Sequence, residues 1–289
     1  MTCHRPIPAY RSQYVNPETG KRQITFSRNN AYTDMPLYLP CGKCLGCQSK
    51  KTNEWALRCT HEAAQYDKNC FITLTYSDEY LPANGGLDHS DFQKFMKRLR
   101  KHFTGTKIRY FMCGEYGSLK ERPHFHAIIF GIDFEDMELL HTNQKGNILN
   151  YTSKTLSKLW PFGFHTIGPV HYGTVKYVAK YSMKRLEENG IDLNGRRPEY
   201  RRMSQGIGSE YAKTYRRDIE IHDNIMINGH KNPVPKYYEK FLCPVKLQLM
   251  KDNRIKLMAK RPRMFLSDYH ILEVMSKKKA KLYENRTYH

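Results

Sequence analysis

The order of apolar segments between residues 70 and 186 constrains the fold of this chain more than any other feature. Three of these segments are rich in β-branched and aromatic residues, as buried strands are: 70–76 (CFITLTY), 107–117 and 123–131. Residues 88–103 instead carry apolar side chains at the spacing of one helical face, behind Asp88 or Ser90 as a cap. The first half of the region therefore predicts the order strand, helix, strand, strand.

The second half of the region continues this mixed order. Residues 152–163 predict a helix that stops at Pro161 and Gly163, and residues 164–170 predict a fourth strand. A third helix is expected over 173–186. Its core-facing residues are expected to be Val175, Val178, Ala179 and Met183. This order favours an α+β fold, an antiparallel sheet flanked by helices, over repeated βαβ units.

The segment before this core differs from it in composition. Residues 1–68 are expected to form a Cys-rich N-terminal extension, irregular and turn-rich over 1–40 and helical over 50–66. The core itself is expected to occupy residues 69–186.

The C-terminal region, residues 187–289, is strongly basic. It is turn-rich up to residue 245, and from residue 246 it carries twelve Lys or Arg against four Asp or Glu. We expect this tail to be helical with a break at Pro262. Such a segment is either a DNA-facing arm or a charged, solvated helix.

The charge balance of the whole chain narrows its partners. Lys and Arg number 48 against 28 Asp and Glu, which gives a net charge of +20 and a pI near 9.5. An excess this large calls for an anionic partner, and nucleic acid is the leading one, with a merely solvated basic surface as the alternative. The 21 tyrosines suit stacking on unpaired bases, although many of them belong in a core.

The sequence gives no sign of a membrane or secretory protein. No window approaches the roughly 18 unbroken apolar residues of a membrane span. The N-terminus, MTCHRPIPAY, has no apolar signal core. We therefore expect the protein to stay in the cytoplasm of the cell that makes it, with no membrane partner.

Two histidines lie one residue apart in the third expected strand. Because residues two apart in a strand point to the same face, His124 and His126 project together while Phe125 points into the core. Two imidazoles on one face can bind a divalent metal with one further ligand. They can also be ordinary histidines on a solvent face, which is the commoner outcome for an isolated pair.

An acidic residue at the end of the preceding strand bears on that choice. The connection from Gly117 to Pro123 is short, so the two strands are expected to form an antiparallel hairpin that brings Glu115 beside both histidines. A carboxylate and two imidazoles, with open positions for water and phosphate oxygens, suit Mg²⁺ or Mn²⁺. The alternative is that Glu115 pairs with a nearby Lys or Arg.

A tyrosine pair follows downstream in the segment YVAKY. Tyr177 and Tyr181 are four apart on an expected helix, so their hydroxyls share a face, with Lys180 on the adjoining surface. A phenol oxygen can attack phosphorus and leave a covalent aryl ester. Tyrosines at this spacing are usually packing residues, and the pair gains specificity by following a Glu…His-x-His strand pair.

The eight cysteines indicate metal binding rather than a disulfide framework, because no secretion signal accompanies them. Four thiolates suit a structural Zn²⁺ ion. Three of the cysteines have the spacing C-x-x-C-x-x-C and a fourth lies near the N-terminus: Cys41, Cys44, Cys47 and Cys3.

Alternatives to a four-cysteine zinc site remain open at this stage. Cys59 or His61 could replace Cys3 as the fourth ligand. A ferredoxin-type run would continue with Cys-Pro, where this chain has Lys51 and Thr52, and this disfavours an iron–sulfur cluster. Plain reduced cysteines are the remaining possibility.

Three motifs, FITLTY, RPHFHAIIFG and YVAKY, follow one another in an order and spacing that resemble the HUH rolling-circle replication initiators. The likeness is greatest to the two-tyrosine initiators of small single-stranded DNA phages. The N-terminal PCGKCLGC and EWALRCTHEA are similar to those of the replication initiators of gokushoviruses, the microviruses that include the Chlamydia phages. The resemblance covers about residues 70–185, and the Cys-rich head extends it nearly to residue 1.

The resemblance implies an HUH endonuclease fold and a metal-dependent nickase. Such a protein cuts one strand of the viral duplex at the origin, becomes joined through tyrosine to the 5′ phosphate, and leaves a 3′-OH primer. It later cuts and joins the displaced strand into a circle. The implied metal ligands are His124, His126 and Glu115, and the implied catalytic residues are Tyr177, Tyr181 and Lys180.

The implied partners are the viral origin, a host helicase and a host DNA polymerase, within the cytoplasm of a bacterial host. A helicase is needed because the chain has no G-x-x-x-x-G-K-[ST] loop for an ATPase of its own. Two other interpretations stand beside this one. The first is a single-stranded-DNA transposase or mobilisation nuclease, whose chemistry needs only one tyrosine, and the second is a non-catalytic, basic nucleic-acid-binding protein.

Overall fold

A computed structural model of the chain describes residues 3–117, 121–142, 149–181, 195–260, 262 and 264–287. The chain divides into two compact units. The first consists of residues 1–51 together with 261–289, and the second of residues 52–260. These bounds differ from the three segments expected from composition, because the two ends of the chain fall in one unit. Each unit is described by itself.

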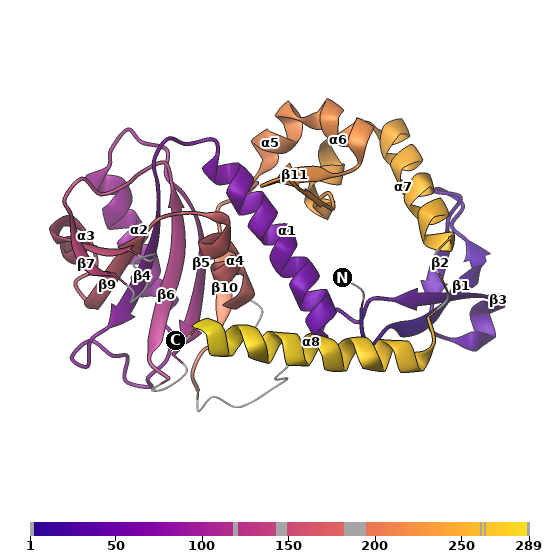
Figure 1. The fold of residues 1–289 in the computed structure, drawn as a ribbon, viewed down its shortest axis with the longest axis horizontal. Coiled ribbons are helices and arrows are strands. Elements are labelled where there is room, and N and C mark those ends of the chain that lie inside the picture. Colours follow the sequence, from indigo (N-terminus) through magenta and orange to yellow (C-terminus); the bar gives the residue numbers. More distant parts are fainter. Residues whose placement is uncertain are drawn as a thin grey trace. The chain divides into compact units, whose positions relative to one another are not determined.

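The second unit is built on a seven-stranded sheet in which neighbouring strands are antiparallel, in the order β10-β5-β6-β4-β9-β8-β7 (Figure 1). Its strands are β4 (Asn69–Tyr76), β5 (Arg109–Tyr116), β6 (Pro123–Phe130), β7 (Met137–Thr142), β8 (Leu149–Ser153), β9 (Gly163–Gly168) and β10 (Tyr200–Met203). The predicted α+β class, an antiparallel sheet with helices on it, is confirmed at this level.

Helices cover both faces of this sheet (Figure 1). On one face a core forms with α2 (His89–His102) and α3 (Lys154–Leu159). On the other face a second core forms with α4 (Tyr172–Tyr181) and with the second half of α1 (Leu45–Ala63), which crosses the boundary between the units. The side chains of the central strands therefore meet a hydrophobic layer on either side.

Strand alternation decides which side chains face which layer. In β4 every second residue is buried, and these buried residues belong to the core beneath α2 and α3. Strand β6 is buried on both faces: Phe125 belongs to the α2–α3 side, and Ile128 and Phe130 to the α4–α1 side. Central strands buried on both faces read as continuous apolar runs, which is why AIIF follows the histidines in the sequence.

Helix caps agree with the sequence signals. The carboxylate of Asp88 accepts a hydrogen bond from the backbone N–H of Ser90 at 2.8 Å, so Asp88 rather than Ser90 caps α2. The predicted apolar stripe of α2 is buried, with Phe95 and Leu99 at 0% exposure. Helix α3 ends at Leu159, two residues before Pro161.

The rest of the second unit forms a smaller helical cluster. It contains α5 (Ser209–Thr214), α6 (Arg216–His222), the hairpin β11 (Ile225–Ile227) and β12 (His230–Asn232), the 3₁₀ helix η2 (Lys236–Phe241) and α7 (Pro244–Ala259). The expectation of a turn-rich segment up to residue 245 was wrong for α5 and α6. These helices have six and seven residues, too few to show a clear helical period in the sequence.

The first unit contains a three-stranded antiparallel sheet, β2-β1-β3, where the sequence predicted an irregular segment, so that prediction was wrong. Its strands are β1 (Ile7–Val15), β2 (Arg22–Thr25) and β3 (Ala31–Leu39), with the 3₁₀ helix η1 (Arg28–Asn30) before β3. The register shifts between Tyr10 and Arg11, and most side chains are exposed on both faces. The regular apolar alternation that signals a strand is therefore missing.

The C-terminal end of the first unit is α8 (Leu266–Thr287), which follows Pro262, so the predicted helical tail with a break at that proline is confirmed. The β7–β8 hairpin was not predicted. Met183 and the rest of the expected helix beyond residue 181 lie outside the described residues. Within the described residues, no helix has the length and apolar content needed to cross a membrane.

Candidate active site

The β5–β6 register brings a carboxylate and two imidazoles to one face of the sheet. Strands β5 and β6 form the predicted antiparallel hairpin, with Glu115 directly opposite His124 and Cys113 opposite His126. Opposed residues of an antiparallel pair point to the same face, as do residues two apart in one strand. Phe125 points the other way and is fully buried, as predicted.

The two imidazoles converge on one oxygen of the carboxylate. Oε1 of Glu115 lies 2.9 Å from Nε2 of His124 and 3.0 Å from Nε2 of His126. One ligand atom from each of the three residues lies within 4.8 Å of the others, so the three could hold a metal ion. Their side chains are largely buried, at 4% exposure for Glu115 and 13% and 8% for His124 and His126.

The outward nitrogen of each histidine has a partner that orients the ring. Nδ1 of His124 lies 2.9 Å from the backbone carbonyl oxygen of Arg122, to which it donates its proton. Nδ1 of His126 lies 2.9 Å from Oγ1 of Thr73, on the neighbouring strand β4. A proton on Nδ1 leaves the Nε2 lone pair aimed at the common point, which is the usual arrangement of metal-binding histidines.

The second oxygen of Glu115 offers an independent test of whether a cation fits. Oε2 is buried and has no hydrogen-bond partner among the described residues. A buried carboxylate oxygen without a partner is costly, and a bound cation removes that cost. Two neutral imidazole nitrogens and a carboxylate form a donor set that divalent metals accept.

Burial and mutual contact set the protonation of the three groups. Burial opposes ionisation of Glu115, but hydrogen bonds from both histidines hold its pKa below the ordinary value. Burial alone would lower the pKa of His124, yet the contact with Glu115 raises it above the ordinary value. For His126 burial dominates and the pKa is lowered, which keeps this ring neutral near pH 7.

Tyr177 lies beside this group. Helix α4 buries Val175 and Val178 against the sheet and leaves Tyr177 40% exposed. The ring of Tyr177 meets the ring of His126 edge-on, with centroids 5.3 Å apart, and it also contacts Phe71 at 6.4 Å. The expected nucleophile and an expected metal ligand are therefore in direct contact.

The two remaining residues of the expected catalytic set lie on the same helix. Lys180 is exposed on α4, three residues after Tyr177, and Tyr181 is the last residue of that helix. The side chain of Tyr181 lies outside the described part of the chain.

The sequence reasoning assigned no role to Thr73 or to Phe71, both of which touch the site. Phe71 stacks near His126 with centroids 5.6 Å apart, and Thr73 pairs with His126 in the β4–β6 register. A signal for both was present in the motif FITLTY, because residues 71 and 73 alternate with the buried positions of β4. Only the strand pairing reveals which histidine they meet.

The cysteines separate into two groups. Cys3, Cys41, Cys44 and Cys47 come together in the first unit and could hold a metal ion. The alternative ligands have other surroundings in the second unit, where Cys59 is fully buried in the core and His61 lies 2.8 Å from the hydroxyl of Tyr238. Cys70 and Cys113 are buried strand residues, as expected.

Comparisons with known proteins agree with this arrangement. Residues 69–186 match the family model for replication-associated proteins of the ORF2 type. The chain is 33% identical over 261 residues to replication-associated protein ORF2 of Spiroplasma virus 4, a match that covers 83% of this chain and 80% of the relative. It is 30% identical over 249 residues to replication-associated protein VP4 of Bdellovibrio phage phiMH2K, covering 83% of this chain and 76% of the relative.

A third relative, replication-associated protein ORF4 of Chlamydia phage 1, is 33% identical over 214 residues, which is 71% of this chain and 53% of that protein. No solved structure matches the chain.

Proposed function

Because this chain belongs to the family of replication-associated proteins of the microviruses, we propose that it is the endonuclease that initiates rolling-circle replication of a phage genome. The observation that carries the proposal is the contact between the Tyr177 ring and the His126 ring, which joins a candidate nucleophile to the Glu115, His124 and His126 group. The net charge of +20 suits a DNA substrate.

In the proposed first step a phenol oxygen of Tyr177 or Tyr181 attacks the scissile phosphorus at the origin. The phenol loses its proton and forms an O–P bond to the 5′ side, while the bond from phosphorus to the 3′ oxygen breaks. The 3′ oxygen takes up a proton and becomes the 3′-OH that primes synthesis. Lys180 offsets the negative charge of the phosphate from the same helix.

The three converging residues Glu115, His124 and His126 would hold Mg²⁺ or Mn²⁺. Such an ion supplies Lewis-acid polarisation of the phosphate. The protein's own contribution is positional: the ligands stand on two central strands, and the ring of His126 abuts Tyr177. Rigid strands hold a reacting group more accurately than loops do.

Two tyrosines allow the reaction to end without ATP. The phosphotyrosine ester conserves the energy of the cleaved phosphodiester. After one round the second tyrosine cuts the regenerated origin, and the released 3′-OH attacks the first phosphotyrosine and closes the circle. Unwinding and synthesis fall to a host helicase and a host DNA polymerase in the cytoplasm of the bacterial host.

The test is formation of a covalent adduct with single-stranded phage-origin DNA in the presence of Mn²⁺, read on a denaturing gel. Wild-type protein should form the adduct, and mass spectrometry should locate the DNA on Tyr177 or Tyr181. The double variant Tyr177→Phe with Tyr181→Phe should form none. Tyr172→Phe, at the start of the same helix, is the matched control and should behave as wild type.

Three results would contradict the proposal in different ways. An adduct in the double variant would show that the nucleophile lies elsewhere. Full cutting and rejoining with Tyr181→Phe alone would favour a one-tyrosine transposase or mobilisation nuclease. Tight DNA binding with no adduct on any origin strand would favour a non-catalytic binding protein.

A further inference from the structure

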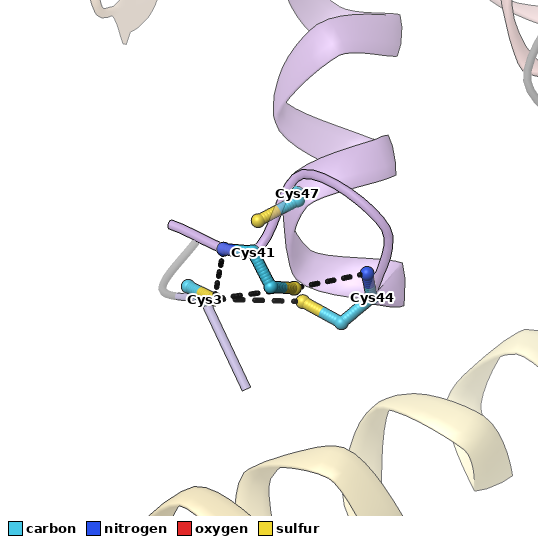
Figure 2. Close-up of side chains that lie close together, drawn as sticks. All are labelled: Cys3, Cys41, Cys44 and Cys47. Atoms are coloured by element: carbon cyan, nitrogen blue, oxygen red, sulfur yellow. Dashed lines mark hydrogen bonds between the residues drawn. The ribbon is translucent and has the colours of Figure 1, made fainter. Parts of the chain in front are cut away.

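Four cysteine side chains of the first unit converge on one point. Figure 2 shows Cys3 from the N-terminal segment, Cys41 from the loop after β3, and Cys44 and Cys47 at the start of α1. Sγ of Cys3 lies 3.6 Å from Sγ of Cys41 and 3.8 Å from Sγ of Cys44. With Zn–S bonds of about 2.3 Å, the sulfurs of a tetrahedral site lie roughly 3.8 Å apart, so these separations match such a site.

The same separations exclude a disulfide in this arrangement. Bonded sulfurs are about 2.05 Å apart, and the four cysteines of the cluster are all free thiols. Four sulfurs gathered without a bond need a reason to stay together, because thiols make only weak hydrogen bonds to one another. A cation bound by four thiolates supplies one.

Backbone amides point at three of the sulfurs. The N–H of Cys41 donates to Sγ of Cys3 at 3.3 Å, and the N–H of Cys44 donates to Sγ of Cys41 at 3.3 Å. The N–H of His4 donates to Sγ of Cys44 at 3.2 Å. Amide donors of this kind offset the negative charge of metal-bound thiolates and orient them.

The residues next to these cysteines contact α8, which belongs to the same unit. His4 follows Cys3, is 6% exposed, and lies with Nε2 3.3 Å from Oγ of Ser276. Nε of Arg5 donates to Oε2 of Glu273 at 2.9 Å. The described contacts of α8 therefore include residues one and two positions from a cysteine of the cluster.

A third contact comes from the other side of the cluster. Leu45, which follows Cys44, lines a shallow hollow together with Val274 and Ala280 of α8. That helix carries the lysine run 277–279 and Lys281. Both the N-terminal segment and the start of α1 thus meet one stretch of α8, between residues 273 and 281.

We propose that Cys3, Cys41, Cys44 and Cys47 bind one structural Zn²⁺ ion, and that this ion holds the N-terminal segment and the start of α1 in the arrangement that docks the lysine-rich helix α8. Without the metal, neither Cys3 nor the loop at Cys41 is tied to α1. His4, Arg5 and Leu45 then lose their common geometry, and α8 loses its contacts within this unit.

The first experiment measures metal content in the full-length protein purified without added metal. One zinc per chain is expected, with little iron, and Co²⁺ exchange should produce thiolate-to-cobalt charge-transfer absorption. Cys44→Ser should lose the zinc, whereas Cys243→Ser, an unclustered cysteine of the second unit, should keep it. Folded wild-type protein that holds no zinc, or holds iron instead, would overturn the proposal.

A second variant separates this site from the candidate active site. His124→Ala with His126→Ala removes two of the three active-site ligands, and it should still hold one zinc per chain while forming no DNA adduct. If the zinc disappears in this variant and persists in Cys44→Ser, the cysteine assignment is wrong. Neither outcome depends on whether the proposed nicking activity is correct.

The docking of α8 is tested by hydrogen–deuterium exchange of its backbone amides. Removing zinc from the wild type with a chelator should speed exchange in α8 by roughly tenfold or more, and adding Zn²⁺ should restore it. The amides of α2 in the second unit are the control and should not change. Unchanged exchange in α8 on complete zinc removal would refute the docking role, and simultaneous loss of protection in α2 would show global unfolding instead.

Discussion

Glu115 and His124 face each other across the β5–β6 pair, and Oε1 of Glu115 lies 2.9 Å from Nε2 of His124. The same oxygen lies 3.0 Å from Nε2 of His126, so one atom marks the point where both imidazoles meet. Antiparallel pairing alone produces this convergence, because opposed residues and residues two apart share a face. The three groups therefore come together without any loop closing over them.

Replacing that carboxylate should weaken metal binding strongly. Glu115→Gln removes the only negative charge of the three groups, and the loss of Mn²⁺ affinity should exceed the roughly 100-fold that loss of an orienting partner costs. Titration of Mn²⁺ followed by electron paramagnetic resonance measures the affinity. Glu135→Gln, at an exposed carboxylate, is the control. Equal Mn²⁺ affinity in Glu115→Gln and wild type would remove Glu115 from the site.

Thr73 is expected to act through His126. Thr73→Val keeps the shape of the side chain but removes Oγ1, the partner of His126 Nδ1. Mn²⁺ affinity should fall by about 10- to 100-fold while the fold persists. Thr75→Val is the matched control, because Thr75 occupies the next position on the same face of β4, pairs with His124 in the register, and forms no hydrogen bond to either histidine within the described residues. A loss of affinity equal in both variants would point to general damage of β4.

Stability should depend on pH through His61. This ring stacks on Tyr211 at 3.6 Å and lies 2.8 Å from the hydroxyl of Tyr238, and burial lowers its pKa to about 4. Below pH 6.5 the unfolded chain takes up a proton at His61 that the folded protein refuses. The contribution of His61 to stability is therefore present above pH 6.5 and is lost as the pH falls toward 4, by roughly 3 kcal/mol.

Urea unfolding of His61→Gln isolates this effect, because glutamine does not titrate. The variant should be less stable than wild type at pH 7, and the difference should shrink by roughly 3 kcal/mol at pH 4. His102→Gln, at an exposed histidine at the end of α2, serves as the control. A difference that stays constant from pH 7 to pH 4 would show that His61 is charged in the folded protein.

Phe125 anchors the histidine strand in the core. Its ring is fully buried and meets Phe92 at 5.5 Å and Trp160 at 5.9 Å between centroids. Phe125→Ala should lower the free energy of unfolding by about 3–5 kcal/mol, whereas Phe164→Ala, at 68% exposure, should change it by less than about 0.5 kcal/mol. Comparable unfolding midpoints for the two variants in urea would contradict the assigned packing.

Much of the candidate site could be read from the sequence because its parts are local. The spacing of His124 and His126 decides their common face, and the short connection before Pro123 predicts the hairpin that brings in Glu115. Local spacing could not reveal Thr73, because its contact with His126 depends on the β4–β6 pairing across more than fifty residues. The β1–β3 sheet was missed for a related reason, since its strands lack a buried face that would impose alternation on the sequence.

By itself, the sequence determined the residue types and their periodicities: a strand with two histidines on one face, a helix with Tyr177 and Tyr181 one turn apart, and cysteines at C-x-x-C-x-x-C spacing. Only the tertiary structure decided which of these meet. Strand pairing and helix packing join Glu115, His126 and Tyr177, and they select Cys3 rather than Cys59 or His61 for the cysteine cluster. The physical reason is that periodicity is a local property of the backbone, whereas convergence depends on which buried faces pack against each other.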